Sequence, residues 1–109
     1  MDPPRKLLIQ MSDAPGSGKS TLANLLAYSI NGVVIDHDLI RSFFLSTSIP
    51  FSQSAQLSYS FQWVLASDIL KQGHSVIVDS TCNYDETVNQ GMELAKQCGV
   101  EYKYVECRV

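Results

Sequence analysis

The chain has 109 residues, of which 45% are hydrophobic and 17% charged, and its net charge is −3. This balance is typical of one globular domain with a buried core, here residues 1–109, and excludes a disordered chain. The acidic charge argues against a protein that grips nucleic acid mainly through backbone phosphates, because such domains are usually basic.

Cysteine usage and hydropathy bear on the cellular compartment. The three cysteines are odd in number and form no CxxC pair, which favours reduced thiols over a disulfide framework or a zinc site. The first residues, MDPPRKLLIQ, hold no apolar stretch long enough for a signal peptide, and no later stretch could span a bilayer. We therefore expect a cytoplasmic protein with no membrane contact.

Apolar runs alternate with segments of helical periodicity. The run KLLIQM predicts a strand over 6–11, before a glycine-rich turn. Residues 19–30 place leucines at helical spacing, and Asn31-Gly32 is expected to end this helix, with Gly32 in the left-handed conformation. The run VVID predicts a second strand over 33–36, and HDLIRSFFL predicts a short helix after it.

The second half of the chain continues this alternation. STSIPFSQS is expected to be a loop, followed by a long helix from about 54 to 72 that Gly73 closes. Five residues form one apolar stripe along this helix: Leu57, Phe61, Val64, Leu65 and Ile69. A third strand over 75–79, a helix over 85–98 and a fourth strand over 101–107 follow. The aromatic residues are expected to be mostly core, with some as candidates for an acceptor pocket: Phe43, Phe44, Phe51, Tyr59, Phe61 and Trp63.

The order β-α-β-α-β-α-β indicates the fold class. Strands that alternate with helices imply a parallel sheet with right-handed crossovers. The strands are continuous apolar runs, as expected when helices cover both faces of the sheet. The sequence therefore predicts an α/β protein, a three-layer α/β/α sandwich.

Residues 13–20 read DAPGSGKS, which fits the phosphate-binding pattern G-x-x-x-x-G-K-[S/T] except at the first glycine, where Asp13 stands. Such a turn, between a strand and a helix, directs backbone N–H groups and the positive end of the helix toward phosphate oxygens. The alternative is a glycine-rich turn that merely joins two elements. We expect a nucleoside triphosphate site formed by Ala14, Pro15, Gly16, Ser17, Gly18, Lys19, Ser20 and Thr21.

Each polar residue of this turn has an expected role. Lys19 would reach the β- and γ-phosphates, Ser20 would ligate Mg²⁺, and Thr21 would lie near the α-phosphate. A carboxylate at Asp13, some 6 Å from a phosphate, would repel it by about 3 kcal/mol at an effective dielectric near 20. This repulsion would weaken affinity by about a hundredfold.

Charged residues follow the second and third predicted strands, where ligands of open α/β sheets bind. Asp79 is interpreted as a Mg²⁺-holding acid, and Asp38 as a general base for an attacking hydroxyl. Arg41, three residues later, would lie on the same helical face and hold a substrate phosphate. The alternatives are a solvated turn aspartate and a surface ion pair. Asp36 is the weaker candidate for orienting the loop or assisting the metal, and His37 is expected to pair with an adjacent acid.

Three stretches together, APGSGKSTLA, VVIDHDLIR and SVIVDSTCN, resemble the small P-loop kinases of the polynucleotide-kinase, zeta-toxin and chloramphenicol-phosphotransferase group, often described as AAA-type ATP-binding domains. The resemblance extends from about residue 6 to 105. It implies the P-loop NTPase fold with strand order 2-3-1-4. It also implies transfer of the γ-phosphoryl group of ATP, with Mg²⁺, to a hydroxyl of a small molecule or a nucleic-acid end.

The resemblance assigns roles residue by residue. Lys19 and Ser20 match the residues that hold phosphates and metal, and Asp79 matches the acid that ends the third strand. Asp38 matches the acceptor-activating acid, and Arg41 the substrate-positioning arginine of the D-x-x-R pattern. Lys19, Asp38 and Arg41 are therefore the expected catalytic residues, and Ser20 and Asp79 the expected metal ligands.

The sequence departs from these families at Asp13 and after the fourth strand, where lid helices, lid arginines and a fifth strand would follow. Loss of such an arginine can lower the rate by about 10³–10⁵. The exposed sheet edge favours association, so a fragment, a shortened relative and a homodimer all stay open. So do an ATPase or nucleotide switch that uses only water and a non-catalytic nucleotide-binding domain. The sequence fits either ATP or GTP.

Overall fold

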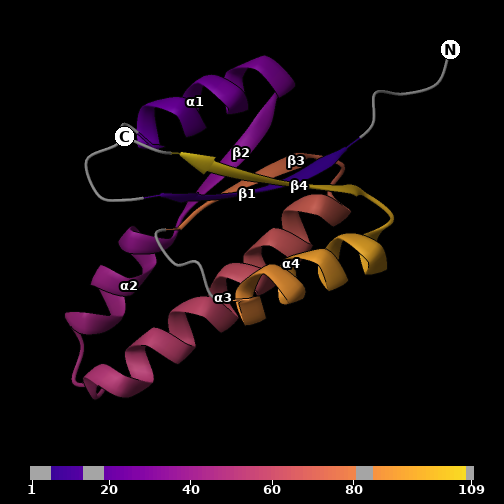
Figure 1. Ribbon diagram of the computed structural model, residues 1–109. Helices are drawn as coiled ribbons and strands as arrows, with labels where there is room; N and C mark the ends of the chain where they lie inside the picture. Colours follow the sequence, from indigo (N-terminus) through magenta and orange to yellow (C-terminus); the bar gives the residue numbers. More distant parts are fainter. Residues whose placement is uncertain (1–5, 14–18, 81–84, 108–109) are drawn as a thin grey trace, which may run out of the picture.

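A computed structural model describes residues 6–13, 19–80 and 85–107 of the chain. Within these ranges, strands and helices follow one another as the sequence predicts (Figure 1). The elements are β1 (Leu7–Asp13), α1 (Lys19–Ile30), β2 (Gly32–Asp36), α2 (His37–Leu45), α3 (Phe51–Lys71), β3 (Ser75–Asp79), α4 (Asp85–Cys98) and β4 (Glu101–Cys107).

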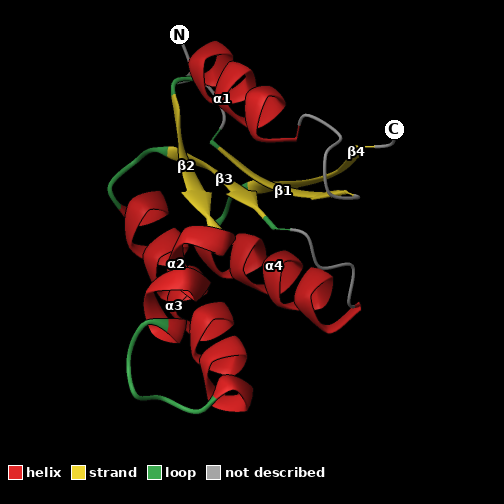
Figure 2. Cartoon of the chain, turned by 90° about the vertical axis from the view of Figure 1, so that its left-hand side faces the viewer, coloured by secondary structure: helices red, strands yellow, loops and turns green. Residues whose placement is uncertain are grey.

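The strands form one parallel sheet in the order β2-β3-β1-β4, which confirms the predicted order and leaves β4 at an edge. α1 covers one face of the sheet, and α3 and α4 cover the other (Figure 1). α2 continues from the end of β2 and lies beside α3 (Figure 2). The arrangement is the expected three-layer α/β/α sandwich.

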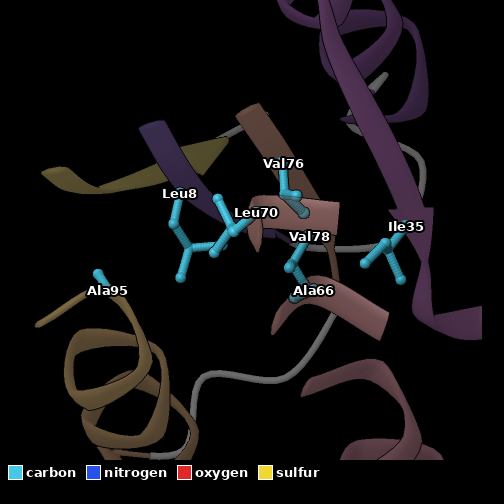
Figure 3. Close-up of a cluster of buried hydrophobic side chains, with 7 residues drawn as sticks. All are labelled: Leu8, Ile35, Ala66, Leu70, Val76, Val78 and Ala95. Atoms are coloured by element: carbon cyan, nitrogen blue, oxygen red, sulfur yellow. The ribbon is translucent and has the colours of Figure 1, made fainter. Parts of the chain in front are cut away.

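Two buried apolar clusters fill the spaces between the layers. The larger one lies between the sheet and the α3/α4 layer (Figure 3) and consists of Leu8, Ile35, Ala66, Leu70, Val76, Val78 and Ala95. The smaller one lies on the α1 side and consists of Ile9, Met11, Ala23 and Ile77. Since successive strand residues point to opposite faces, β1 and β3 contribute to both clusters. β3 is buried at every position, as expected for a strand covered on both faces.

Two element boundaries differ from the sequence prediction. Asn31, not Gly32, takes the left-handed conformation after α1, with a φ angle of 55°. Asparagine is one of the few residues that adopt this conformation readily. Gly32 instead begins β2, where a Cβ atom would lie 3.1 Å from the carbonyl oxygen of Ser75 on β3. α3 begins at Phe51, earlier than expected, because the proline before it is compatible with a helix start.

The buried face of α3 is not the apolar stripe predicted from the sequence. The buried residues of this helix recur at every fourth position: Ser54, Ser58, Gln62, Ala66 and Leu70. Within the predicted stripe, Leu57, Phe61 and Val64 are 41%, 44% and 66% exposed. Leu65 and Ile69 are partly buried against the larger cluster. The buried face of α3 is therefore polar toward its start and apolar toward its end.

Local hydrogen bonds explain why a polar helix face can be buried. The Ser54 hydroxyl donates to the carbonyl of Phe51 at 2.8 Å, and the Ser58 hydroxyl donates to the carbonyl of Ser54 at 2.6 Å. Hydroxyls that are satisfied within their own helix avoid most of the cost of burying a polar group. Several aromatic side chains expected in the core are exposed instead, among them Phe43, Phe51 and Phe61.

A buried histidine joins α2 to α3. His37, the first residue of α2, is 2% exposed, and its Nδ1–H donates a hydrogen bond of 3.0 Å to Oε1 of Gln62. The imidazole also stacks on Tyr59, with 4.1 Å between ring centroids and 29° between ring planes. The ring nitrogen is thus paired with an amide of α3 and not with the neighbouring acid that the sequence suggested.

Burial lowers the pKa of His37 below its ordinary value of 6.5, because desolvation disfavours the imidazolium form. The charge of Arg41 acts in the same direction, whereas Gln62 and the charges of Asp38 and Asp36 oppose it with smaller effects. Within the described chain, Nε2 of His37 has no hydrogen-bond partner, so a second N–H there would be unpaired. His37 is therefore a neutral imidazole at pH 7.

α4 comes close to the sheet and to α3 at Gly91. A Cβ atom at this position would lie 2.8 Å from Oε1 of Gln10, 2.9 Å from the ring of Tyr102 and 3.1 Å from the ring of Trp63. The Tyr102 phenol donates a hydrogen bond of 2.6 Å to the same Gln10 oxygen. Burial raises the pKa of this phenol to about 12, so it remains a donor at neutral pH. Because glycine has no side chain, Gly91 allows α4 to approach α3 and the sheet this closely.

Replacing Gly91 by alanine should lower the free energy of unfolding by about 1–3 kcal/mol, the usual cost of overpacking a core. Alanine favours a helix over glycine by about 1 kcal/mol, so any net loss reports the clash. Urea unfolding followed by circular dichroism measures the effect. Asn89→Ala, at an exposed position of α4, should change stability little. If Gly91→Ala is more stable than the parent by about 1 kcal/mol, the helix-propensity gain alone, α4 can shift outward without loss.

The lowered pKa of His37 should make stability depend on pH. As the pH falls, the unfolded chain binds this proton first, at about 6.5, and the folded chain only at a lower pH. The free energy of unfolding should therefore be highest above this window and fall as the pH drops through it. Urea titrations from about pH 8 to pH 5 measure this slope, which should flatten in His37→Gln.

His74→Gln is the matched control for this experiment, because it removes the other histidine, which is exposed. It should keep the slope of the parent. If the parent and His37→Gln show the same pH dependence, His37 is not a buried neutral imidazole.

Candidate functional site

The carboxyl ends of three parallel strands meet at one edge of the sheet. Asp79, at the end of β3, is in register with Asp36 of β2 on one side and with Met11 of β1 on the other. The backbone N–H of Ser80 donates to the carbonyl of Met11 at 3.3 Å, which keeps the strand ends together. β1 ends at Asp13, directly before the predicted phosphate-binding turn. The register therefore places the acid of β3 between the two other candidate segments.

The side of the sheet on which Asp79 lies follows from strand alternation. Val78 belongs to the cluster beside α3, whereas Ile77 belongs to the cluster beside α1. Asp79 therefore falls on the α1 face, and it is 2% exposed. α1 begins at Lys19, after the turn that leaves this edge. A buried carboxylate on the face of the helix that follows the turn fits the oxygen ligands that Mg²⁺ prefers.

Most of the predicted phosphate-binding residues lie outside the described part of the chain, namely Ala14, Pro15, Gly16, Ser17 and Gly18. The backbones of Lys19 and Ser20 form the start of α1, but their side chains are not described, and the same holds for the side chain of Asp13. Thr21 lies in the first turn of α1 and is exposed. The described residues thus agree with the motif in one respect, a helix that begins at its lysine.

The first turn of α2 is fixed by Asp36. Its Oδ1 accepts the backbone N–H groups of Asp38 at 3.0 Å and Leu39 at 3.3 Å, which is a helix N-cap. Asp38 follows with an exposed side chain. Asp36 therefore holds the backbone that carries Asp38, a structural role close to the loop-orienting one that the sequence suggested.

Arg41 lies one turn after Asp38 on α2. Its guanidinium carbon is 5.3 Å from the ring centroid of Phe51, the first residue of α3. A guanidinium over an aromatic face is attracted by the ring quadrupole, so Phe51 limits the motion of the arginine. Nε of Arg41 is buried and has no partner among the described residues. The half-buried arginine is thus held at the junction of α2 and α3.

Sequence reasoning missed Gln62 and its contact with His37. His37 stands between the capping Asp36 and the exposed Asp38, and its bond to Gln62 fastens this turn to α3. Because the imidazole is neutral at pH 7, it adds no positive charge beside the two carboxylates. Hydropathy could not point to Gln62, which is polar and yet fully buried.

None of the described helices is long and apolar enough to cross a bilayer. Over residues 8–109, the sequence matches the AAA domain family. No curated protein matches the sequence significantly.

Solved kinase structures share the fold. A mutant APS kinase of Mycobacterium tuberculosis superposes with a TM-score of 0.76 and 20% identity over 98% of this chain and 78% of its own. The same kinase in complex with AMPPNP and APS gives a TM-score of 0.75 and 21% identity, over 96% and 64%. A chain of the Pnkp1/Rnl/Hen1 complex gives 0.80 and 17%, over 100% of this chain and 38% of its own.

The chain therefore spans between about two fifths and four fifths of these structures. At such identities the likeness concerns the fold, and the family match covers nearly the whole sequence. The chain belongs to the AAA domain family and has a P-loop kinase-like fold.

Proposed function

We propose that the chain binds ATP with Mg²⁺ and transfers its γ-phosphoryl group to a hydroxyl group of an acceptor. One observation carries this proposal: the end of β1, Asp79 and the first turn of α2 meet at the same sheet edge. A phosphoryl transfer needs a phosphate site, an oxygen ligand for a metal, and an acceptor base close together. The AAA family membership supports the nucleotide part.

The phosphate site is proposed at residues 14–21. In this proposal Lys19 binds the β- and γ-phosphates as a point charge, and the backbone N–H groups at the start of α1 add neutral donors. Ser20 and Asp79 are the residues that would hold Mg²⁺, which when bound neutralises charge on the phosphates. The burial of Asp79 on the α1 face supports this assignment.

The acceptor side of the site is proposed at the start of α2. Asp38 would take the proton of the acceptor hydroxyl while the hydroxyl oxygen attacks the γ-phosphorus. The bond between the γ-phosphorus and the β,γ-bridging oxygen would break, which leaves ADP. The capping bonds from Asp36 support this role, because they fix the backbone of the base. Arg41 would position the acceptor from the next turn, where Phe51 already limits its motion.

Asp13 favours a second candidate, a domain that binds nucleotide weakly and transfers nothing. A third candidate is an ATPase or nucleotide switch that needs the phosphate site and Asp79 but not Asp38 or Arg41. Binding and transfer experiments separate the three.

ATP with Mg²⁺ should raise the melting temperature of the chain. Ligand at 100 times its dissociation constant stabilises a fold by about 2.7 kcal/mol. The measurement is a thermal melt at rising ATP concentrations, with and without Mg²⁺. Lys19→Ala should reduce the shift because it removes a phosphate ligand. If millimolar ATP leaves the melting temperature unchanged, the chain does not bind the nucleotide as proposed.

Asp38→Asn should slow phosphoryl transfer by about 10²–10⁴-fold, the usual contribution of a general base, and leave the ATP-induced melting shift intact. Arg41→Ala should weaken acceptor binding. Both are measured with γ-labelled ATP against a set of hydroxyl compounds, with hydrolysis by water recorded in parallel. Asp68→Asn, an exposed acid of α3, is the control and should transfer normally. Equal transfer by Asp38→Asn and the control would remove the base from the mechanism.

A further inference from the structure

A pocket lies between α3 and α4, apart from the candidate site at the strand ends, and we call it the α3/α4 pocket. Its volume is about 400 Å³, which is within the range of small-molecule sites. Besides Ala55, its lining consists of Gln56, Tyr59, Ser60, Trp63, Thr87 and Gln90. Thr87 and Gln90 belong to the first two turns of α4, the helix that follows the carboxyl end of β3. The start of α4 lies toward the sheet edge at which β3 ends (Figure 1), and the lining residues of α4 come from that end of the helix.

The lining combines aromatic rings with uncharged polar groups. Tyr59 and Trp63 stand one turn apart on α3, and Gln56, Ser60 and Gln90 are neutral hydrogen-bonding residues. None of the described lining residues carries a formal charge. Amides and hydroxyls both donate and accept hydrogen bonds, as a ligand rich in hydroxyl groups requires.

Both aromatic walls are held in place by other residues. The indole Nε1–H of Trp63 donates to Oε1 of Gln90 at 2.9 Å, and the ring packs over Gly91. Tyr59 stacks on His37, which is itself bonded to Gln62. Walls that are ordered before binding lower the entropy that a ligand must lose.

Tyr59 connects the pocket to the proposed acceptor base. One side of its ring faces His37, and His37 directly precedes Asp38 in the first turn of α2. Tyr59 is also part of the pocket lining. A ligand in the α3/α4 pocket is thus separated from the turn that carries Asp38 by two stacked aromatic rings, so the pocket is distinct from the acceptor position beside Asp38.

We propose that the α3/α4 pocket binds an uncharged ring compound rich in hydroxyls, of the sugar or cyclitol class. The ring would lie against Trp63 and Tyr59, and its hydroxyls would pair with the amides and hydroxyls of the lining. This binding does not depend on the proposed function.

The same lining disfavours a phosphorylated compound or a nucleic-acid end. Phosphate groups are recognised by arginine forks, lysines or free backbone N–H groups. Arg41 is not among the described lining residues, and it lies over Phe51 instead.

The single tryptophan of the chain gives a direct readout, because Trp63 lines the pocket. The intrinsic fluorescence of the 109-residue chain is titrated, without ATP, with glucose and myo-inositol and with their monophosphates. At least one uncharged compound should give a saturable change. Its monophosphate should bind about tenfold more weakly or worse, since its charge finds no partner in the lining.

Variants tie the signal to the pocket. Gln56→Ala should weaken binding by about fivefold, the effect of losing one neutral hydrogen bond of about 1 kcal/mol. Gln53→Ala, at an exposed position of the same helix outside the lining, should bind like the parent. The proposal is overturned if no uncharged member binds saturably, if the monophosphates bind more tightly, or if the two variants behave alike.

The experiment also separates this proposal from the proposed function. Saturable sugar or cyclitol binding without any ATP-induced melting shift would reject the kinase and leave the pocket. Transfer of phosphate to an acceptor, with fluorescence unchanged by both uncharged compounds, would reject ligand binding in the pocket and leave the kinase function standing.

Discussion

Parallel pairing of β3 with both β1 and β2 is the constraint on which the candidate site depends. Because β3 lies between the other two strands, their carboxyl ends reach one edge, and the segments that follow them begin there. The segments come from distant parts of the sequence, yet the register brings Asp79 level with Asp36 and Met11. The central residues of β3, Val76, Ile77 and Val78, are apolar, and every residue of the strand is buried, as expected for a strand that helices cover on both faces. The chemistry at the edge is therefore made possible by the packing below it.

The α3/α4 layer changes character along the sheet. Away from the edge, Ala66 and Leu70 of α3 pack on the apolar cluster, whereas toward the edge Ser58 and Gln62 are buried instead. Burying polar groups in such a place costs stability unless they are hydrogen-bonded. The Ser58 hydroxyl, Nδ1 of His37 and Oε1 of Gln62 are paired, whereas Nε2 of His37 and Nε2 of Gln62 have no partner among the described residues. Part of the stability that an apolar stripe would supply is exchanged for a directional contact. That contact fixes the first turn of α2, which apolar packing alone would leave free to slide.

Fold class and the positions of most elements followed from hydrophobic runs, and the strand order followed from the family resemblance that three motifs carry. Neither could indicate the close approach of α4 at Gly91, which Gly91→Ala examines. The buried face of α3 could not be predicted, because hydropathy ranks Leu57 and Phe61 above Ser54 and Ser58 although the serines bond within their own helix. The partner of His37 was missed since it lies 25 positions away on another helix, which spacing along one element does not reveal. Asn31 in place of Gly32 was missed because Gly32 begins β2, beside the backbone of Ser75. Of the candidate site, the strand-end acids could be placed in advance, whereas the aromatic pocket depends on how two helices meet.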